Sequence, residues 1–186
     1  AHLLSHLPLP RTIKASLKTL SLTFDLFLGR PSQAMLPVAY LGSGNFPKAK
    51  NEADPAKDGA GIIWFAPLVP MEGKKLNDYV KLVESILEKY GLPQMITFTT
   101  MNDRCFDAPL PIVFNKNDSE STSSAKACYN ELWEESLKLG IMPYRLPIDE
   151  HYRVTESGTP FWNTAKKLKD ALDPNNIIAP GRYSKK

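Results

Sequence analysis

The chain has 186 residues and a formal net charge of +3, with 23 basic and 20 acidic side chains interleaved along it. This length is enough for one sizeable hydrophobic core, or for one domain with a long extension. The sequence contains no apolar run of the roughly 20 residues that a membrane span needs, and no basic stripe of the kind that binds nucleic acid. We therefore expect a soluble protein, cytoplasmic by default, that binds neither a membrane nor nucleic acid.

The cysteines and histidines do not indicate a metal site. Cys105 and Cys128 lack the spacing of metal ligands, and His2, His6 and His151 form neither an H-x-H nor an H-E-x-x-H pattern. The first residues include no initiator Met and no signal-peptide pattern. We interpret the sequence as a piece of a longer protein.

Residues 1–58 are predicted to form a lead-in of helix and loop. Apolar residues recur there at steps of three and four: Ile13, Leu17, Leu20, Phe24 and Leu28. This spacing predicts an amphipathic helix that ends at Gly29, and residues 32–36 predict a short second helix before Pro37. Residues 42–59, rich in Gly, Asn, Pro, Lys and Asp, predict a long loop.

Four strands are predicted in the remainder of the chain. The apolar run over 61–67 is typical of a buried strand, and the alternation over 95–101 is typical of a half-buried one. Residues 110–114 predict a third strand, which its prolines restrict to an edge or a late start. The fourth contains Tyr144 and Arg145.

Three helices are predicted between and after these strands. They cover residues 75–90, residues 125–139 after a polar loop over 115–124, and a last segment with Thr159 as cap and Pro160 at its first position. The apolar face of the first consists of Leu76, Tyr79, Val80, Val83, Ile86, Leu87 and Tyr90, and the last carries Phe161, Trp162, Ala165, Leu168 and Leu172. The order of elements over 59–186 predicts an α+β fold, a ferredoxin-like antiparallel sheet covered by helices.

Tyr144 and Arg145 are the candidate functional pair. Pro143 and Pro147 hold the short segment around them in an extended conformation. A phenol hydroxyl and a guanidinium are both donors, so the pair would bind a phenolate or a carboxylate and keep it ionised. The alternative is a surface strand with a packed Tyr and a solvated Arg. Neighbours on a regular strand point to opposite faces, so a shared ligand atom requires a bulge or a turn.

Several segments, in this order, carry a family resemblance: residues 58–67, 97–99 and 112–115, then Pro143-Tyr144-Arg145, and the tail over 173–182 that reads Asp-Pro-Asn-Asn-Ile-Ile-Ala-Pro-Gly-Arg. Together they resemble the C-terminal, substrate-binding half of the vanillyl-alcohol oxidase and para-cresol methylhydroxylase family of FAD-linked oxidases. The resemblance implies a cap domain over 59–186 that forms a roof over FAD. It also implies that residues 1–58 join this cap to an FAD-binding domain that is not in this sequence.

The resemblance also implies roles for individual residues. Tyr144 and Arg145 match the pair that binds the phenolate oxygen of a para-substituted phenol, from which hydride passes to FAD. Trp64 and Thr97 match positions that line the substrate site, although a Trp in an apolar strand is equally often a core residue. Arg182 would face FAD or a neighbouring carboxylate, or would be a solvated residue after a turn.

Two positions depart from the family pattern. Ile62 occupies the position of a histidine that is covalently bonded to the flavin in vanillyl-alcohol oxidase. After the 97–99 segment, a Met-His-His stretch is replaced by a sequence with no histidine. Any polar substrate contact there must come from Asp103, Arg104 or Asp107, of which we select Asp107, while at least one of these charges is expected to be a solvated hairpin tip.

The sequence therefore predicts the cap of an FAD-dependent oxidoreductase that acts on a para-substituted phenol or an aromatic alcohol. One alternative is the cap of an FAD-linked 2-hydroxy-acid dehydrogenase, in which Arg145 binds a carboxylate. The other is a non-enzymatic ferredoxin-like module that binds a ligand. The expected partners are the FAD-binding domain, a phenolic substrate, and a second copy of the chain or a cytochrome.

Overall fold

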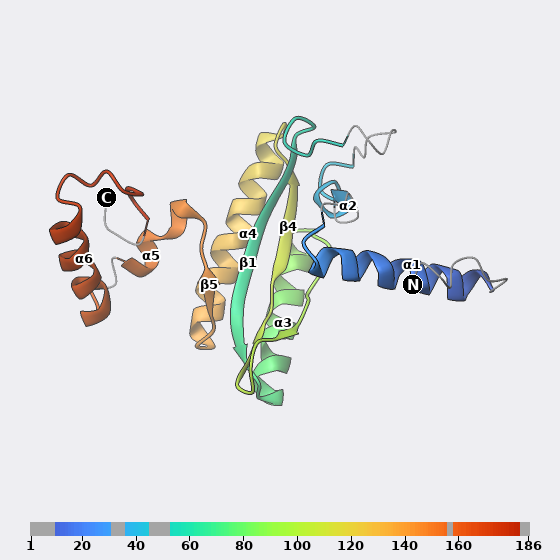
Figure 1. Cartoon of the computed structure of the whole chain (residues 1–186), viewed down its shortest axis with the longest axis horizontal. Helices are drawn as coiled ribbons and strands as arrows, with labels where there is room; N and C mark the ends of the chain where they lie inside the picture. Colours follow the sequence, from blue (N-terminus) through green and yellow to red (C-terminus); the bar gives the residue numbers. More distant parts are fainter. Residues whose placement is uncertain (1–9, 31–35, 45–52, 156–157, 183–186) are drawn as a thin grey trace. The chain divides into compact units, whose positions relative to one another are not determined.

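The computed structural model in Figure 1 describes residues 10–30, 36–44, 53–155 and 158–182. Contacts group these residues into two units. One consists of residues up to Ile62 together with Val113–Lys126, and the other consists of Ile63–Ile112 together with the residues from Ala127 onward. The domain boundary that we expect after residue 58 stays a prediction.

The sheet is built around β1 (Ala60–Pro70), the longest strand. It pairs antiparallel with β3 (Cys105–Asp107) and with β5 (Met142–Arg145), and β3 pairs antiparallel with β2 (Thr99–Thr100). β4 (Leu110–Asn115) follows β3 along the chain and also pairs with β1. Because β1 lies between β5 and the β3–β4 segment, with β2 outermost, the arrangement is ferredoxin-like and the predicted α+β class is confirmed.

Two helices cover one face of this sheet (Figure 1). In α3 (Gly73–Lys89), Tyr79, Val83, Ile86 and Leu87 are buried, which confirms the predicted apolar face. α4 (Ser119–Lys138) packs on β1, where the ring of Tyr129 meets that of Phe65 edge-on with centroids 5.7 Å apart.

A polar contact joins α3 to α4. Glu131 of α4 accepts hydrogen bonds from Lys89 Nζ at 2.7 Å and from the Tyr90 hydroxyl at 2.8 Å. Both partners lower the pKa of Glu131, Lys89 the more strongly, so the carboxylate stays ionised. The two helices are therefore tied together at the end of α3 by an ion pair as well as by apolar packing.

Sequence periodicity misplaced two boundaries and missed one strand. The strand predicted over 95–101 is wrong except for Thr99–Thr100, because Phe98 packs edge-on against Tyr79 and Phe106 instead of joining a ladder. The missed strand is β3, which forms a hairpin with β2. α4 begins at Ser119, inside the predicted loop, because the Asp118 carboxylate accepts the backbone N–H groups of the first turn.

The first unit contains α1 (Arg11–Phe27) and α2 (Leu36–Ala39). α1 confirms the predicted helix and ends before Gly29, whose φ is +69°, but it has no buried residue. The short helix expected over 32–36 falls mostly outside the described residues, and α2 starts at Leu36. Residues 45–52 of the loop predicted over 42–59 also lie outside the described residues.

Gly42 lies against the backbone at the end of β4. A Cβ built on Gly42 would lie 2.3 Å from the backbone nitrogen of Phe114, a contact that only movement of the main chain can relieve. We therefore expect Gly42→Ala to lower the free energy of unfolding by about 2 kcal/mol. Gly73→Ala is the control, since a Cβ there meets open space. Equal thermal midpoints for the two variants in a denaturation scan would contradict the close approach.

Candidate active site

β5 has an irregular register where Tyr144 and Arg145 lie. Pro143 pairs with Pro67, whereas Arg145 pairs with Ala66, so two steps along β5 match one step along β1. Tyr144 is therefore the extra residue of a β-bulge. Both Tyr144 and Arg145 are exposed, although neighbours on a regular strand would face opposite sides of the sheet. The bulge therefore removes the strict alternation that would place these two side chains on opposite faces.

The Tyr144 hydroxyl donates a hydrogen bond to Asp107 Oδ2 at 3.2 Å. Leu68 of β1 pairs with Asp107 of β3 at one edge and with Met142 of β5 at the other edge. The hydrogen bond from Tyr144 to Asp107 therefore crosses β1. Partial burial and the Asp107 charge raise the pKa of Tyr144, while Arg145 acts in the opposite direction. Tyr144 is therefore protonated at neutral pH, with its proton directed at Asp107.

The other oxygen of Asp107 is buried and has no hydrogen-bond partner among the described residues. A buried acceptor without a donor costs on the order of 1–3 kcal/mol, more when it is charged. An incoming donor group would therefore gain a strong interaction with this carboxylate.

Arg145 adds a positive charge beside this pair. Its guanidinium carbon lies 5.4 Å from the centroid of the Tyr144 ring, a cation–π contact that orients the side chain while leaving it exposed. Ala66 of β1 pairs with Arg145. Trp64 lies two residues before Ala66, so Trp64 and Ala66 are on the same face of β1. At 47% exposure Trp64 is not a core residue, which favours the site-wall interpretation over the core alternative.

This face combines an exposed aromatic wall, a guanidinium, a phenol hydroxyl and a carboxylate. The set fits an aromatic ligand with an ionisable hydroxyl. Among the residues that the structure describes, no group of three or more His, Cys, Asp or Glu side chains is arranged to hold a metal ion. In the same residues, no helix is long and apolar enough to cross a membrane.

Comparisons with known proteins agree on one family. Residues 149–183 match the family described as FAD linked oxidases, C-terminal domain. The chain is 33% identical over 127 residues to the flavoprotein subunit of 4-cresol dehydrogenase (hydroxylating) from Pseudomonas putida, which covers 68% of the chain and 24% of that protein. It is 28% identical over 156 residues to 1'-carboxy-chondrochloren decarboxylase from Chondromyces crocatus, covering 84% of the chain and 28% of that protein.

Solved structures give the same result. p-Cresol methylhydroxylase with substrate bound superposes with a TM-score of 0.61 at 33% identity, over 67% of this chain and 24% of that one. The isoeugenol complex of 4-ethylphenol oxidase from Gulosibacter chungangensis also has a TM-score of 0.61, at 22% identity over 68% of this chain and 25% of that one, a likeness of fold. The chain belongs to the FAD-linked oxidases, as a C-terminal cap domain. It spans about a quarter of the length of these relatives.

Two further residues of this FAD-linked oxidase domain have expected roles. Ile62 is half-buried near the start of β1. Thr97 is exposed and precedes β2, and its backbone N–H donates to the Pro109 carbonyl at 3.4 Å. Their expected roles toward flavin and substrate stay predictions.

The tail of this FAD-linked oxidase domain is organised by Asp173. Its carboxylate is buried and accepts the backbone N–H groups of Ile177 at 2.9 Å and Ile178 at 2.8 Å, and it also pairs with Lys169. Lys169 and these backbone bonds lower the pKa of Asp173. Arg182 follows this turn and is exposed, a position compatible with both interpretations of its role.

We expect Asp173→Asn to loosen this turn. The depressed folded pKa means that the carboxylate stabilises the turn above about pH 4, and that this contribution is lost as the pH falls through the folded pKa. Hydrogen exchange at the Ile177 and Ile178 amides should therefore be faster in the variant at pH 7, and the difference from wild type should shrink as the pH falls through the folded pKa. Asp170→Asn, which removes an exposed ion pair with Lys166, is the control. A difference that is independent of pH would contradict the role of the carboxylate.

Sequence reasoning missed the segment that follows β5. A 3₁₀ turn (Ile148–Glu150) and α5 (Tyr152–Thr155) come directly after it. Arg153 donates to Glu150 and to Asn130 of α4, and its guanidinium carbon lies 5.4 Å from the centroid of the Trp133 ring. The spacing of three residues between Glu150 and Arg153 is typical of an ion pair on a helical turn, and it could have predicted this turn from the sequence.

Proposed function

We propose that this chain is the substrate-binding part of an FAD-dependent oxidoreductase that oxidises a para-substituted phenol or an aromatic alcohol. The observation that carries the proposal is the bulge in β5, which leaves Tyr144 and Arg145 exposed together beside Asp107. The relatives named for 4-cresol and p-cresol support the same substrate class.

The three polar side chains have complementary tasks in this proposal. Since the Tyr144 proton is directed at Asp107, the hydroxyl of a neutral phenol can donate to the Tyr144 oxygen. The phenol proton can then pass to the Tyr144 oxygen as the Tyr144 proton passes to Asp107, and Arg145 stabilises the resulting phenolate by charge and by hydrogen bonding. A phenolate releases electron density through the ring toward the benzylic carbon at the para position, the carbon that loses hydride during oxidation.

FAD, when bound, supplies the two-electron acceptor for hydride from the benzylic carbon. The face formed by Tyr144, Arg145 and Trp64 would orient the phenol and exclude water from the reacting carbon. We assign Ile62 and Arg182 to the flavin side of the site and Thr97 to its substrate side. Because Ile62 has no nucleophilic atom, it forms no covalent bond to FAD.

The proposed partners follow from the share of the relatives that this chain covers. The FAD-binding domain of the same enzyme would lie over the open face of the sheet. The Pseudomonas putida relative is named a flavoprotein subunit, which supports a further subunit here, either a cytochrome that accepts electrons or a second copy of the chain.

Two other functions compete with this proposal. Arg145 suits the carboxylate of a 2-hydroxy acid, and the Chondromyces crocatus relative, named a decarboxylase of a carboxylated compound, also favours a carboxylate ligand. A non-enzymatic ligand-binding module would use the same face without turnover.

Anaerobic reduction of the flavin distinguishes these functions. The purified protein that carries this sequence would be mixed with 4-ethylphenol, 4-hydroxybenzyl alcohol or mandelate. Loss of the oxidised flavin absorbance with the phenols and not with mandelate is the expected result. Reduction by mandelate alone would favour the 2-hydroxy acid, and phenol binding without reduction would favour the module.

A further inference from the structure

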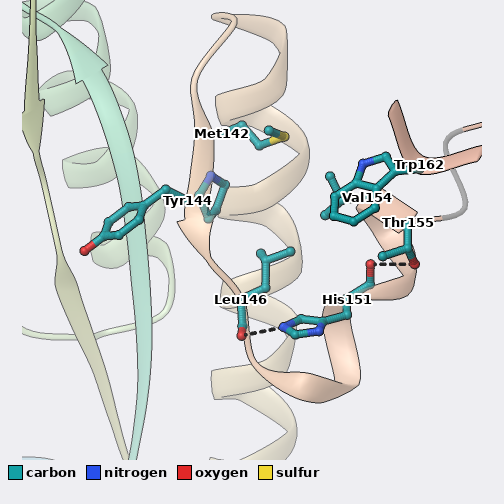
Figure 2. Close-up of a pocket in the computed structure, with 8 residues that line it drawn as sticks. Met142, Tyr144, Leu146, His151, Val154, Thr155 and Trp162 are labelled. Atoms are coloured by element: carbon teal, nitrogen blue, oxygen red, sulfur yellow. Dashed lines mark hydrogen bonds between the residues drawn. The ribbon is translucent and has the colours of Figure 1, made fainter. Parts of the chain in front are cut away.

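A cavity lies behind β5, on the side away from the Tyr144 hydroxyl (Figure 2). Its volume is ≈ 150 Å³. β5 and the residues after it form one wall, and α5 and α6 (Pro160–Leu172) form the other. The lining side chains are Met142, Pro143, Leu146, Val154, Trp162 and three with polar groups, Tyr144, His151 and Thr155.

The polar groups of Tyr144, His151 and Thr155 have hydrogen-bond partners within the protein. His151 Nε2 lies 3.1 Å from the Leu146 carbonyl oxygen, and the Thr155 hydroxyl donates to the His151 carbonyl at 3.1 Å. In Figure 2 the Tyr144 ring points toward β1, away from His151, Val154 and Trp162, and its hydroxyl is bonded to Asp107. The interior of the cavity is therefore walled mainly by apolar atoms.

A cavity of this size and lining favours a small apolar occupant. An apolar pocket of about 150 Å³ is large enough for a benzene ring. The Met142 thioether and the Trp162 indole both make favourable contacts with an aromatic ring.

We propose that this cavity is a second ligand site, which takes a monocyclic aromatic compound without needing a hydroxyl group. It is distinct from the face formed by Tyr144, Arg145 and Trp64, because the Tyr144 hydroxyl lies on the opposite side of β5. A ring in the cavity would contact the backbone of the strand that carries Tyr144 and Arg145. This inference does not rest on the proposed function.

Iodobenzene is the probe, since it has no hydroxyl and its iodine is located directly by anomalous scattering. Crystals of the purified protein that carries this sequence would be soaked with it, and solution binding would be measured by calorimetry. We expect an iodine peak between Val154 and Trp162 and saturable binding in solution. No peak there, or a peak without saturable binding (binding at crystal concentration only), would overturn the proposal.

Cavity-filling variants test the location. Val154→Phe should weaken iodobenzene binding at least tenfold. If that variant fails to fold, Met142→Phe is a second cavity-filling variant, because Met142 is half-exposed and tolerates a larger side chain. Leu137→Phe, on the exposed side of α4, is the matched control and should bind as wild type does. Equal affinity in the folded filling variants and in the control would overturn the proposal. Flavin reduction by 4-ethylphenol tests the phenol site separately.

Discussion

Arg145→Lys should lower kcat/KM for 4-ethylphenol by about 100-fold while leaving thermal stability almost unchanged. Lysine keeps the positive charge but loses the planar fork that binds a phenolate oxygen with two N–H donors. Removing one donor that stabilises developing charge costs about 10²–10³ in rate. Because Arg145 is exposed, little packing is lost.

The matched control is Arg104→Lys, at the exposed tip of the β2–β3 hairpin. Its kcat/KM and thermal midpoint should both equal those of the wild type. Steady-state kinetics and thermal scans of the wild type, Arg145→Lys and Arg104→Lys test whether activity is lost without a loss of stability. Losses of activity and stability in parallel for Arg145→Lys would mean that Arg145 is structural.

Val83→Asp should unfold the cap. Val83 is fully buried on α3, so an aspartate there is either an unpaired buried charge or a neutral acid in an apolar site. The expected loss exceeds about 4 kcal/mol, against a total stability of about 5–15 kcal/mol for a typical domain. The cooperative transition in a urea titration should disappear.

Lys81→Asp is the control for the change in helix charge. Lys81 lies on the exposed side of the same helix and should tolerate the substitution within about 0.5 kcal/mol. A soluble Val83→Asp protein with a cooperative transition would show that the buried face of α3 has been assigned to the wrong residues.

The hydrogen bond between Tyr144 and Asp107 changes the role that Tyr144 can have toward a ligand. The sequence treats Tyr144 as a donor to a phenolate, but its proton is already directed at a carboxylate. In the proposed function, Arg145 would then be the main source of positive charge for the phenol, and Asp107 would accept the Tyr144 proton as Tyr144 takes that of the phenol. For this reason the activity test is made at Arg145.

The sequence by itself determined the helices with clear stop signals and a continuous apolar face. The face of α3 satisfies the 3.6-residue period over four turns, and Thr159 with Pro160 marks the start of α6, so local rules were sufficient. The sequence also determined the family, because the Tyr-Arg pair and the tail are contiguous motifs.

Only the tertiary structure decided which residues meet at the site. Asp107 and Tyr144 are 37 positions apart and approach each other because β3 and β5 flank the same strand. The bulge that exposes two neighbouring side chains depends on the register of β5 with β1, which local propensity does not encode. The turn held by Asp173 and the cavity behind β5 likewise depend on contacts between segments, so no pattern along the chain could predict them.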